Sequence, residues 1–161
     1  MKYVTEEQLL DIQKFLNEKY KERTPTILFQ TEAFATGFDS GMSINDIVET
    51  KVESFQDRLF QMIREKQLDE VEMYKRGNIS RQLFSKIKSE KDYHPTKNTV
   101  FSLAIGMKLN IDEASELLEK AGYSFSSANK GDLIIQYFLY HKSYNIFAIN
   151  EVLDKYGFEI L

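Results

Sequence analysis

Apolar residues recur every three to four positions along most of this chain, which is the spacing of one face of an α-helix. Near its start, Ile12 and Leu16 belong to such a face. Thr5, followed three residues later by Gln8, is typical of a capping box, in which two side chains satisfy free backbone N–H groups. The pattern therefore predicts a helix over residues 6–21.

Residues 22–43 lose this period. Pro25, Gly37 and Gly41 interrupt the segment, and these residue types favour turns and loops over helix interiors. We therefore expect a linker or a docking arm here, with a short extended piece at 26–30.

Helical spacing resumes at Ser43 and continues almost to the end of the chain. The predicted helices cover 44–48, 55–67, 69–77, 80–89, a segment capped by Thr96 that carries Val100 to Met107, a segment from the capping box Asn110-x-x-Glu113 to Gly122, 131–141 and 146–156. The apolar tail 157–161 is expected to dock on them. The chain is therefore predicted to be all-α, with an N-terminal helix and arm over 1–52, a helical domain over 53–126 and a C-terminal helical pair over 127–161.

Composition narrows the classes of protein to consider. The chain has 161 residues, of which 42% are hydrophobic and 29% charged, as in ordinary globular domains. It has no cysteine, which excludes disulfides and thiolate metal sites. No apolar run reaches about 18 residues, and the start lacks the hydrophobic core of a signal peptide, so we expect a cytoplasmic protein.

The charge is unevenly distributed. The whole chain carries a net charge of −4, but residues 74–98 hold seven Lys or Arg side chains and two carboxylates, a net charge of +5. An acidic protein with one basic region is typical of a local binding face for a polyanion, although a solvated surface balanced by acidic segments is the alternative.

This basic region coincides with a helix, turn and helix pattern within residues 68–111. Asn78-Ile79-Ser80 supplies the turn and the N-cap of the second helix. In a helix-turn-helix, the first turn of the second helix reads base edges while flanking cations hold phosphates. The candidate base-reading residues are Arg81, Gln82 and Ser85, and the candidate phosphate-binding residues are Lys75, Arg76, Lys86, Lys88, Lys91 and Lys97.

On these residues the chain resembles the five-helix, lambda-repressor-like (Xre-type) helix-turn-helix domain over about 55–118. The matching residues are Ile79-Ser80-Arg81, Phe84-Ser85-Lys86-Ile87, Pro95-Thr96, Thr99, Leu103-Ala104, Met107, Leu109 and Ile111-Asp112-Glu113. Over 54–161 it is also similar to an uncharacterised bacterial subfamily, in which a C-terminal helical pair follows this domain and the whole is often appended to larger cytoplasmic signalling proteins. The resemblance implies a DNA-binding fold.

Four positions depart from the family pattern. Tyr74 stands where a small residue is usual, Gly77 replaces a core Leu, Leu83 replaces a polar residue that faces DNA, and Lys108 replaces a Gly that ends a helix. An exposed apolar residue on a reading helix points to a protein partner. The candidate protein-contact residues are Leu83, Tyr140, Tyr144, Phe158 and Leu161.

Signs of an enzyme are weak in this sequence. His94 and His141 are its only histidines and lie in different segments, so we expect no metal site and no cofactor. His94 is expected to fix a loop by contacting the backbone, and His141 to end a helix. No Gly-rich phosphate loop or nucleophile motif is visible.

Two functions and one weaker alternative follow. The first is a non-enzymatic regulator of transcription that binds double-stranded DNA as a homodimer. The second is an adaptor derived from a helix-turn-helix, with a protein partner in bacterial signalling or in phage–host conflict. The weakest is an enzyme whose active site lies in residues 22–53. No membrane or small-molecule partner is expected.

Overall fold

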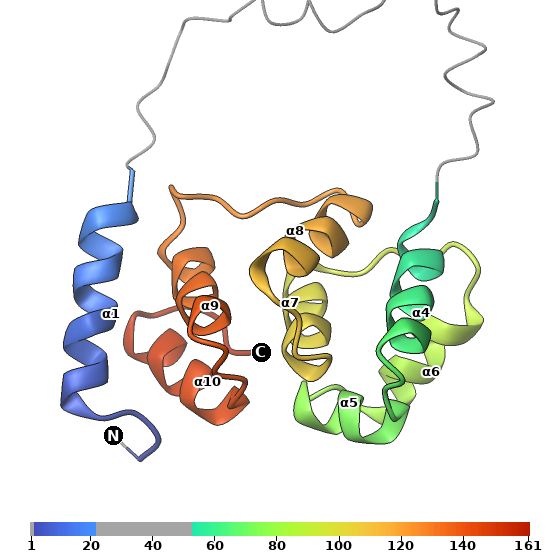
Figure 1. Ribbon diagram of the computed structural model, residues 1–161, viewed down its shortest axis with the longest axis horizontal. Helices are drawn as coiled ribbons and strands as arrows, with labels where there is room; N and C mark the ends of the chain where they lie inside the picture. The colour runs from blue at the N-terminus through green and yellow to red at the C-terminus, as the bar shows by residue number, and fades with distance from the viewer. Residues whose placement is uncertain (1, 22–52) are drawn as a thin grey trace, which may run out of the picture.

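The structure is a computed structural model that describes residues 2–21 and 53–161. These residues form helices and no strand: α1 (Glu6–Lys19), α4 (Phe55–Glu65), α5 (Glu70–Arg76), α6 (Arg81–Ser89), α7 (Lys97–Gly106), α8 (Ile111–Lys120), α9 (Lys130–Tyr140) and α10 (Ile146–Lys155) (Figure 1). The all-α prediction is confirmed for this part of the chain. None of these helices combines the length and apolar character that a membrane span requires. The predicted extended piece at 26–30 and helix at 44–48 lie outside the described residues.

Polar side chains determine where each described helix begins. The N-caps are Thr5, Ser54, Asp69, Ser80, Thr96, Asn110, Asn129 and Asn145, and each accepts a hydrogen bond from a backbone N–H of the first turn. The capping box predicted between Asn110 and Glu113 is confirmed, and Ser54 forms a second one with Asp57. Local sequence therefore specifies these starts.

Six of the helices end in the same reversal. The residue after each C-cap has a positive φ: Gln67, Asn78, Lys108, Gly122, Lys142 and Gly157. The next residue then donates its N–H back into the last turn, as Ile79 does to the Tyr74 carbonyl at 2.8 Å. Lys108, which stands where the resembling family has Gly, adopts φ 52° and makes the same turn. A positive φ at a non-glycine residue raises the free energy of the folded chain by about 1 kcal/mol. At Lys108, burial of the next residue, Leu109, offsets this cost.

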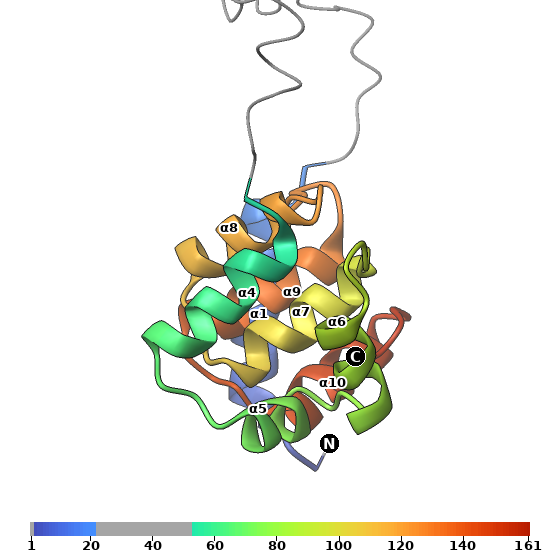
Figure 2. The ribbon, with the colours of Figure 1, turned by 90° about the vertical axis from the view of Figure 1, so that its right-hand side faces the viewer.

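Helix α7 is the centre of the first group of helices, α4–α8. Its residues 100–106 are all buried, and it packs against α5 and α8, while α4 packs against α8 (Figure 2). A Cβ on Gly77 would lie 2.3 Å from the Ser102 carbonyl oxygen, and one on Gly106 would lie 2.4 Å from the Met73 carbonyl oxygen. These contacts explain why Gly77 replaces a larger core residue, since helices α5 and α7 touch through backbone at that point.

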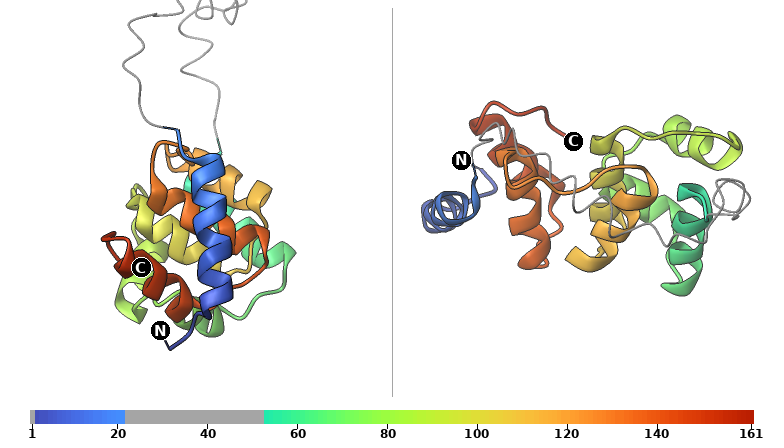
Figure 3. Two further views of the ribbon diagram at one scale, coloured as in Figure 1. Left: turned by 90° about the vertical axis from the view of Figure 1, so that its left-hand side faces the viewer. Right: turned by 90° about the horizontal axis from the view of Figure 1, so that it is seen from above.

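Helix α9 is the centre of a second group, which we call the α1–α9–α10 unit. Helix α1 lies against α9 at the end of the molecule opposite to α4 and α6 (Figures 1 and 3). It buries Ile12 and Leu16, and the Tyr137 hydroxyl donates to the Asp11 carboxylate at 2.6 Å. The sequence predicted a C-terminal pair and a separate N-terminal helix, and it did not anticipate this contact.

A partly buried ion pair joins the two groups. Lys97, at the start of α7, lies 2.5 Å from the carboxylate of Asp132, which is only 3% exposed. The same carboxylate accepts the Ser126 backbone N–H at 2.8 Å. Because an unpaired buried carboxylate is costly, this contact helps to hold α7 against α9.

Candidate nucleic-acid interface

The segment from α5 to α6 has the local geometry of a helix, a tight turn and a helix. Gly77 ends α5, Asn78 takes φ 56°, and the Ile79 side chain is buried beneath the turn. Ser80 then caps α6 by accepting the Leu83 backbone N–H at 3.0 Å. The turn and cap predicted from Asn78-Ile79-Ser80 are confirmed, and α6 leaves α5 in a new direction (Figure 2).

Two side chains anchor α6 on the core. Phe84 and Ile87 are buried, and the Phe84 ring centroid lies 5.5 Å from that of Tyr74 and 6.3 Å from that of Phe60. Tyr74 is half-buried and fills space beside α6, which explains a large residue at a position where the resembling family has a small one. The anchor leaves the opposite side of α6 in solvent.

This outward face holds the candidate base-reading residues. Arg81, Gln82 and Ser85 are all exposed and, at helical spacing, lie on the side away from Phe84 and Ile87. Within the described residues, their side chains make no hydrogen bond or ion pair. Helix α6 contains no acidic residue. The face therefore combines hydrogen-bonding groups and positive charge, and α6 itself adds no carboxylate to it.

Three predicted phosphate-binding side chains are exposed on α5, on α6 and just after α6. Lys75, Lys86 and Lys91 are exposed, and the Lys86 ammonium lies 5.9 Å from the centre of the Tyr93 ring. Lys88 is also exposed, but its ammonium is 2.9 and 3.0 Å from the two oxygens of Glu70. Lys88 therefore has a competing carboxylate, whereas the other three do not in the part of the chain that the structure describes.

Two members of the predicted phosphate-binding set face inward instead. Arg76 donates to the Gly106 carbonyl at 2.6 Å, across the contact between α5 and α7. Lys97 forms the ion pair with the buried Asp132 carboxylate, and its own side chain is 27% exposed. In the structure both side chains contact a neighbouring helix, a role that the charge pattern alone did not indicate.

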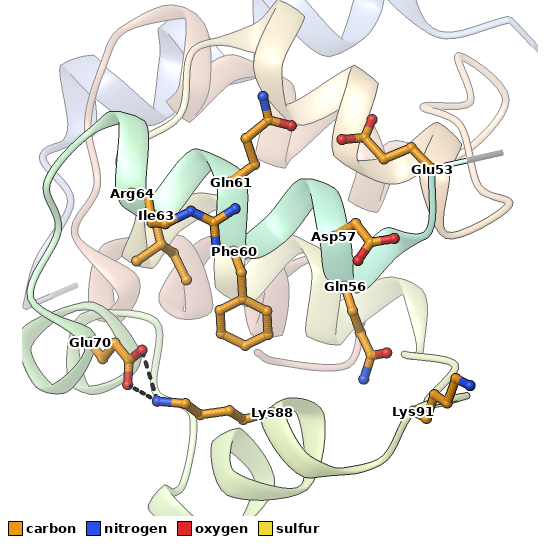
Figure 4. Close-up of a pocket in the computed structure, with 10 residues that line it drawn as sticks. All are labelled: Glu53, Gln56, Asp57, Phe60, Gln61, Ile63, Arg64, Glu70, Lys88 and Lys91. Atoms are coloured by element: carbon orange, nitrogen blue, oxygen red, sulfur yellow. Dashed lines mark hydrogen bonds and ion pairs between the residues drawn. The ribbon is translucent and has the colours of Figure 1, made fainter. Parts of the chain in front are cut away.

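A groove of about 700 Å³ lies between α4 and the α5–α6 side of this face. Figure 4 shows the Phe60 ring between the Glu70–Lys88 pair and Gln56. Gln56 donates to the Ile87 carbonyl at 2.7 Å and so ties α4 to α6. Carboxylates and cations alternate along the rim, which makes the groove a poor anion site.

No family model matches this chain. No curated protein and no solved structure matches it either. Its function is therefore inferred from its own residues and their geometry.

Most of the predicted protein-contact residues are used inside the molecule. Leu83 is half-buried against the core, which corrects the expectation that it is an exposed apolar residue on α6. Tyr144 is also half-buried, its hydroxyl donates to the Leu109 carbonyl at 2.8 Å, and burial raises its pKa. Phe158 and Leu161 are half-buried and pack against the core. Only Tyr140 is exposed, at 56%.

The structure also reveals an exposed aromatic pair that the sequence reading missed. Phe147 is 61% exposed and Tyr3 is 44% exposed, with stacked rings whose centroids are 5.5 Å apart. The carboxylate of Glu151 accepts the backbone N–H groups of Lys2 and Tyr3 at 2.5 and 2.8 Å, so the start of the chain is held on α10. This pairing joins residues far apart in the sequence, and helical periodicity carries no signal for it.

Both histidines have local structural roles. The Nε2 atom of His94 lies 3.0 Å from the Ala121 carbonyl oxygen, which confirms the predicted backbone contact. His141 is the C-cap of α9, as predicted, and its Nδ1 atom lies 2.8 Å from the Tyr137 carbonyl oxygen. Its Nε2 atom lies 3.9 Å from the Asp11 carboxylate, at the contact of α1 with α9.

Proposed function

We propose that the protein is a non-enzymatic regulator that binds double-stranded DNA through α6. In this proposal α4–α8 form a lambda-repressor-like (Xre-type) helix-turn-helix module, α5 crosses the sugar–phosphate backbone, and α6 enters the major groove. The observation that carries the proposal is the outward face of α6, which is exposed, basic and free of carboxylates next to a tight capped turn. The sequence resemblance over about 55–118 supports the same assignment.

Each exposed side chain has a role that follows from its chemistry. Arg81 suits the two acceptors of guanine, and Gln82 suits the donor and acceptor of adenine. Ser85, one turn later, accepts from or donates to either base type. Lys75, Lys86 and Lys91 hold phosphates, and Lys88 joins them when it leaves Glu70. A homodimer would place two such helices in successive major-groove segments of one operator.

The proposal is tested by duplex binding in a double variant. Arg81→Ala with Lys86→Ala removes one base-reading group and one phosphate contact, and we expect at least a tenfold loss of affinity for a random-sequence duplex at about 50 mM salt. The matched control is Lys14→Ala with Lys155→Ala, which removes two exposed cations from the α1–α9–α10 unit. Fluorescence anisotropy of a labelled duplex measures both. If both double variants lose the same factor of duplex affinity, the interaction depends only on overall charge, and α6 is not the binding helix.

A second candidate is an adaptor that binds a protein, and the exposed Tyr3–Phe147 pair favours it. Aromatic rings are enriched at the centres of protein interfaces. The contact surface would then lie on the α1–α9–α10 unit and include Tyr140, not on α6, where Leu83 is half-buried. The two functions therefore use different ends of the molecule, and substitutions at one end leave the other intact.

A further inference from the structure

The segment 158–161 connects the α1–α9–α10 unit to the turn between α5 and α6. The carbonyl oxygen of Leu161 accepts one hydrogen bond from the side-chain amide of Asn78 and another from that of Asn150, each at 2.9 Å. The Leu161 backbone N–H donates to the Asn150 side-chain oxygen at 2.8 Å. One backbone group thus links α10 to the turn that begins α6.

The rest of the segment is held on three helices. The Phe158 ring lies over Gly131 of α9, where an added Cβ would be 3.1 Å from a ring atom. The Glu159 carboxylate accepts a hydrogen bond from the side chain of Asn98, in α7, at 3.2 Å. Since α7, α9 and α10 all contact the segment, Leu161 is presented to Asn78 from a supported position.

Asn78 lies in the turn between α5 and α6. It has φ 56° and lies between Gly77, which is against the Ser102 carbonyl, and Ile79, which is buried. Helix α6 begins three residues later, at Arg81. The Asn78 side chain is exposed, so its amide is not needed to fill the core.

We infer that Asn78 is a positioning residue, through which the 158–161 segment sets the orientation in which α6 presents Arg81 and Gln82 to DNA. This inference rests on the proposed function. In this inference the α1–α9–α10 unit affects DNA binding without contacting DNA. The unit positions Leu161, the hydrogen bond from Asn78 to Leu161 fixes the turn, and the turn sets the orientation of α6. Release of the segment leaves the module folded and loosens its binding face.

The test is Asn78→Gly in the full chain. Glycine keeps the positive φ at little steric cost and removes only the amide that donates to Leu161. Gln67→Gly is the matched control, because Gln67 is an exposed, neutral residue with φ 51° at the other end of α5. We expect Asn78→Gly to weaken duplex binding about three- to tenfold at low salt, the size of effect that one lost hydrogen bond gives. We expect Gln67→Gly to leave binding unchanged.

The salt dependence separates positioning from simple destabilisation. A variant that is only less folded loses the same factor of affinity at each salt concentration, whereas a misdirected α6 loses phosphate contacts. We therefore expect the log–log salt slope of Asn78→Gly to become shallower by about 1. Asn150→Ala should act in the same way, and the double variant should lose no more than either single one, because both act through Leu161. An unchanged slope, or losses that add in the double variant, would overturn the inference.

Hydrogen exchange gives a readout that does not depend on DNA. Asn78→Gly should speed exchange of the Leu83 and Phe84 backbone amides about tenfold, while Gln67→Gly should leave them unchanged. If the wild-type chain binds no duplex and these amides still respond, the proposed function fails and the link from Leu161 to the turn stands. If neither exchange nor affinity responds to Asn78→Gly, the inference is wrong.

Discussion

Helices α6 and α10 present opposite kinds of surface. The outward face of α6 carries Arg81, Gln82, Ser85 and Lys86 and no carboxylate. The outward face of α10 carries the exposed ring of Phe147 followed by the carboxylates of Glu151 and Asp154. Residues 74–98 have a net charge of +5, while residues 99–161, with five basic and eight acidic side chains, have a net charge of −3. A polyanion is attracted to the first surface and repelled by the second.

This difference in surface charge suggests separate roles for the two groups of helices. The α4–α8 group carries the candidate interface with DNA, and the α1–α9–α10 unit supports it through Lys97–Asp132 and through Leu161. The exposed aromatic pair Tyr3–Phe147 is then free to contact a protein without disturbing α6. Changes at Lys97 and Phe147 test whether the ends are coupled and distinct in this way, and a change at Glu113 tests a contact within one of them.

The largest expected effect comes from Lys97→Met, which breaks the ion pair between the two groups. It leaves the Asp132 carboxylate buried without its cation, and we expect a loss of about 3 kcal/mol in the free energy of unfolding. Lys155→Met, at an exposed site on α10, should cost less than about 0.5 kcal/mol. Urea denaturation measures both.

A double variant tests whether the unpaired Asp132 carboxylate causes this loss of stability. The double variant Lys97→Met with Asp132→Asn should regain most of the lost stability, because the remaining group is neutral and still accepts the Ser126 N–H. If the double variant is as unstable as Lys97→Met, loss of side-chain packing explains the effect and the ion pair does not.

An intermediate effect is expected for Phe147→Asp, at the opposite end from α6. Loss of the stacked contact with Tyr3 and repulsion from Glu151, one turn away, should destabilise the chain by about 1 kcal/mol. Duplex affinity should stay within about twofold of wild type, since the change removes no phosphate contact. A large loss of DNA binding in this variant would show that the two surfaces are not separate.

The smallest expected effect is the pH dependence of a contact within the α4–α8 group. Burial acts to raise the pKa of Glu113, but the hydrogen bonds from Lys66 and from the Asn110 N–H outweigh it, so the pKa lies below its ordinary value. A lowered folded-state pKa contributes stability that is present above the unfolded pKa and is lost as pH falls through the folded one. Wild type should exceed Glu113→Gln by less than about 1 kcal/mol at pH 7, and this difference should shrink as pH falls below the ordinary pKa of a glutamate.

Urea denaturation across this pH range tests the assignment. Glu119→Gln, an exposed carboxylate on the same helix, is the control and should show no such convergence. A difference between wild type and Glu113→Gln that stays constant from pH 7 to pH 3 would contradict a titrating contact.

Local features of the structure could be predicted from the sequence because they depend on neighbouring residues. Ser80, Thr96 and Asn110 cap the helices they were expected to cap, and Asn78 makes the expected turn. The outward placement of Arg81 follows from helical period alone. In each case the cause lies within about four residues of the effect.

Long-range contacts could not be predicted in this way. Arg76 and Lys97 look like surface cations by spacing, and only packing brings them to Gly106 and Asp132. The contact of Asp11 with Tyr137 joins residues 126 positions apart. Such pairings depend on how whole helices pack, for which periodicity holds no information.

The most direct test of DNA binding by α6 is the affinity of the full chain for a labelled duplex as salt is varied. Lys75, Lys86 and Lys91 make no ion pair within the described residues, so we predict a log–log slope of about −3 per bound chain. We predict a shallower slope together with a large loss of affinity in Arg81→Ala with Lys86→Ala. No binding at about 50 mM salt, or a slope that this double variant leaves unchanged, would contradict the proposal.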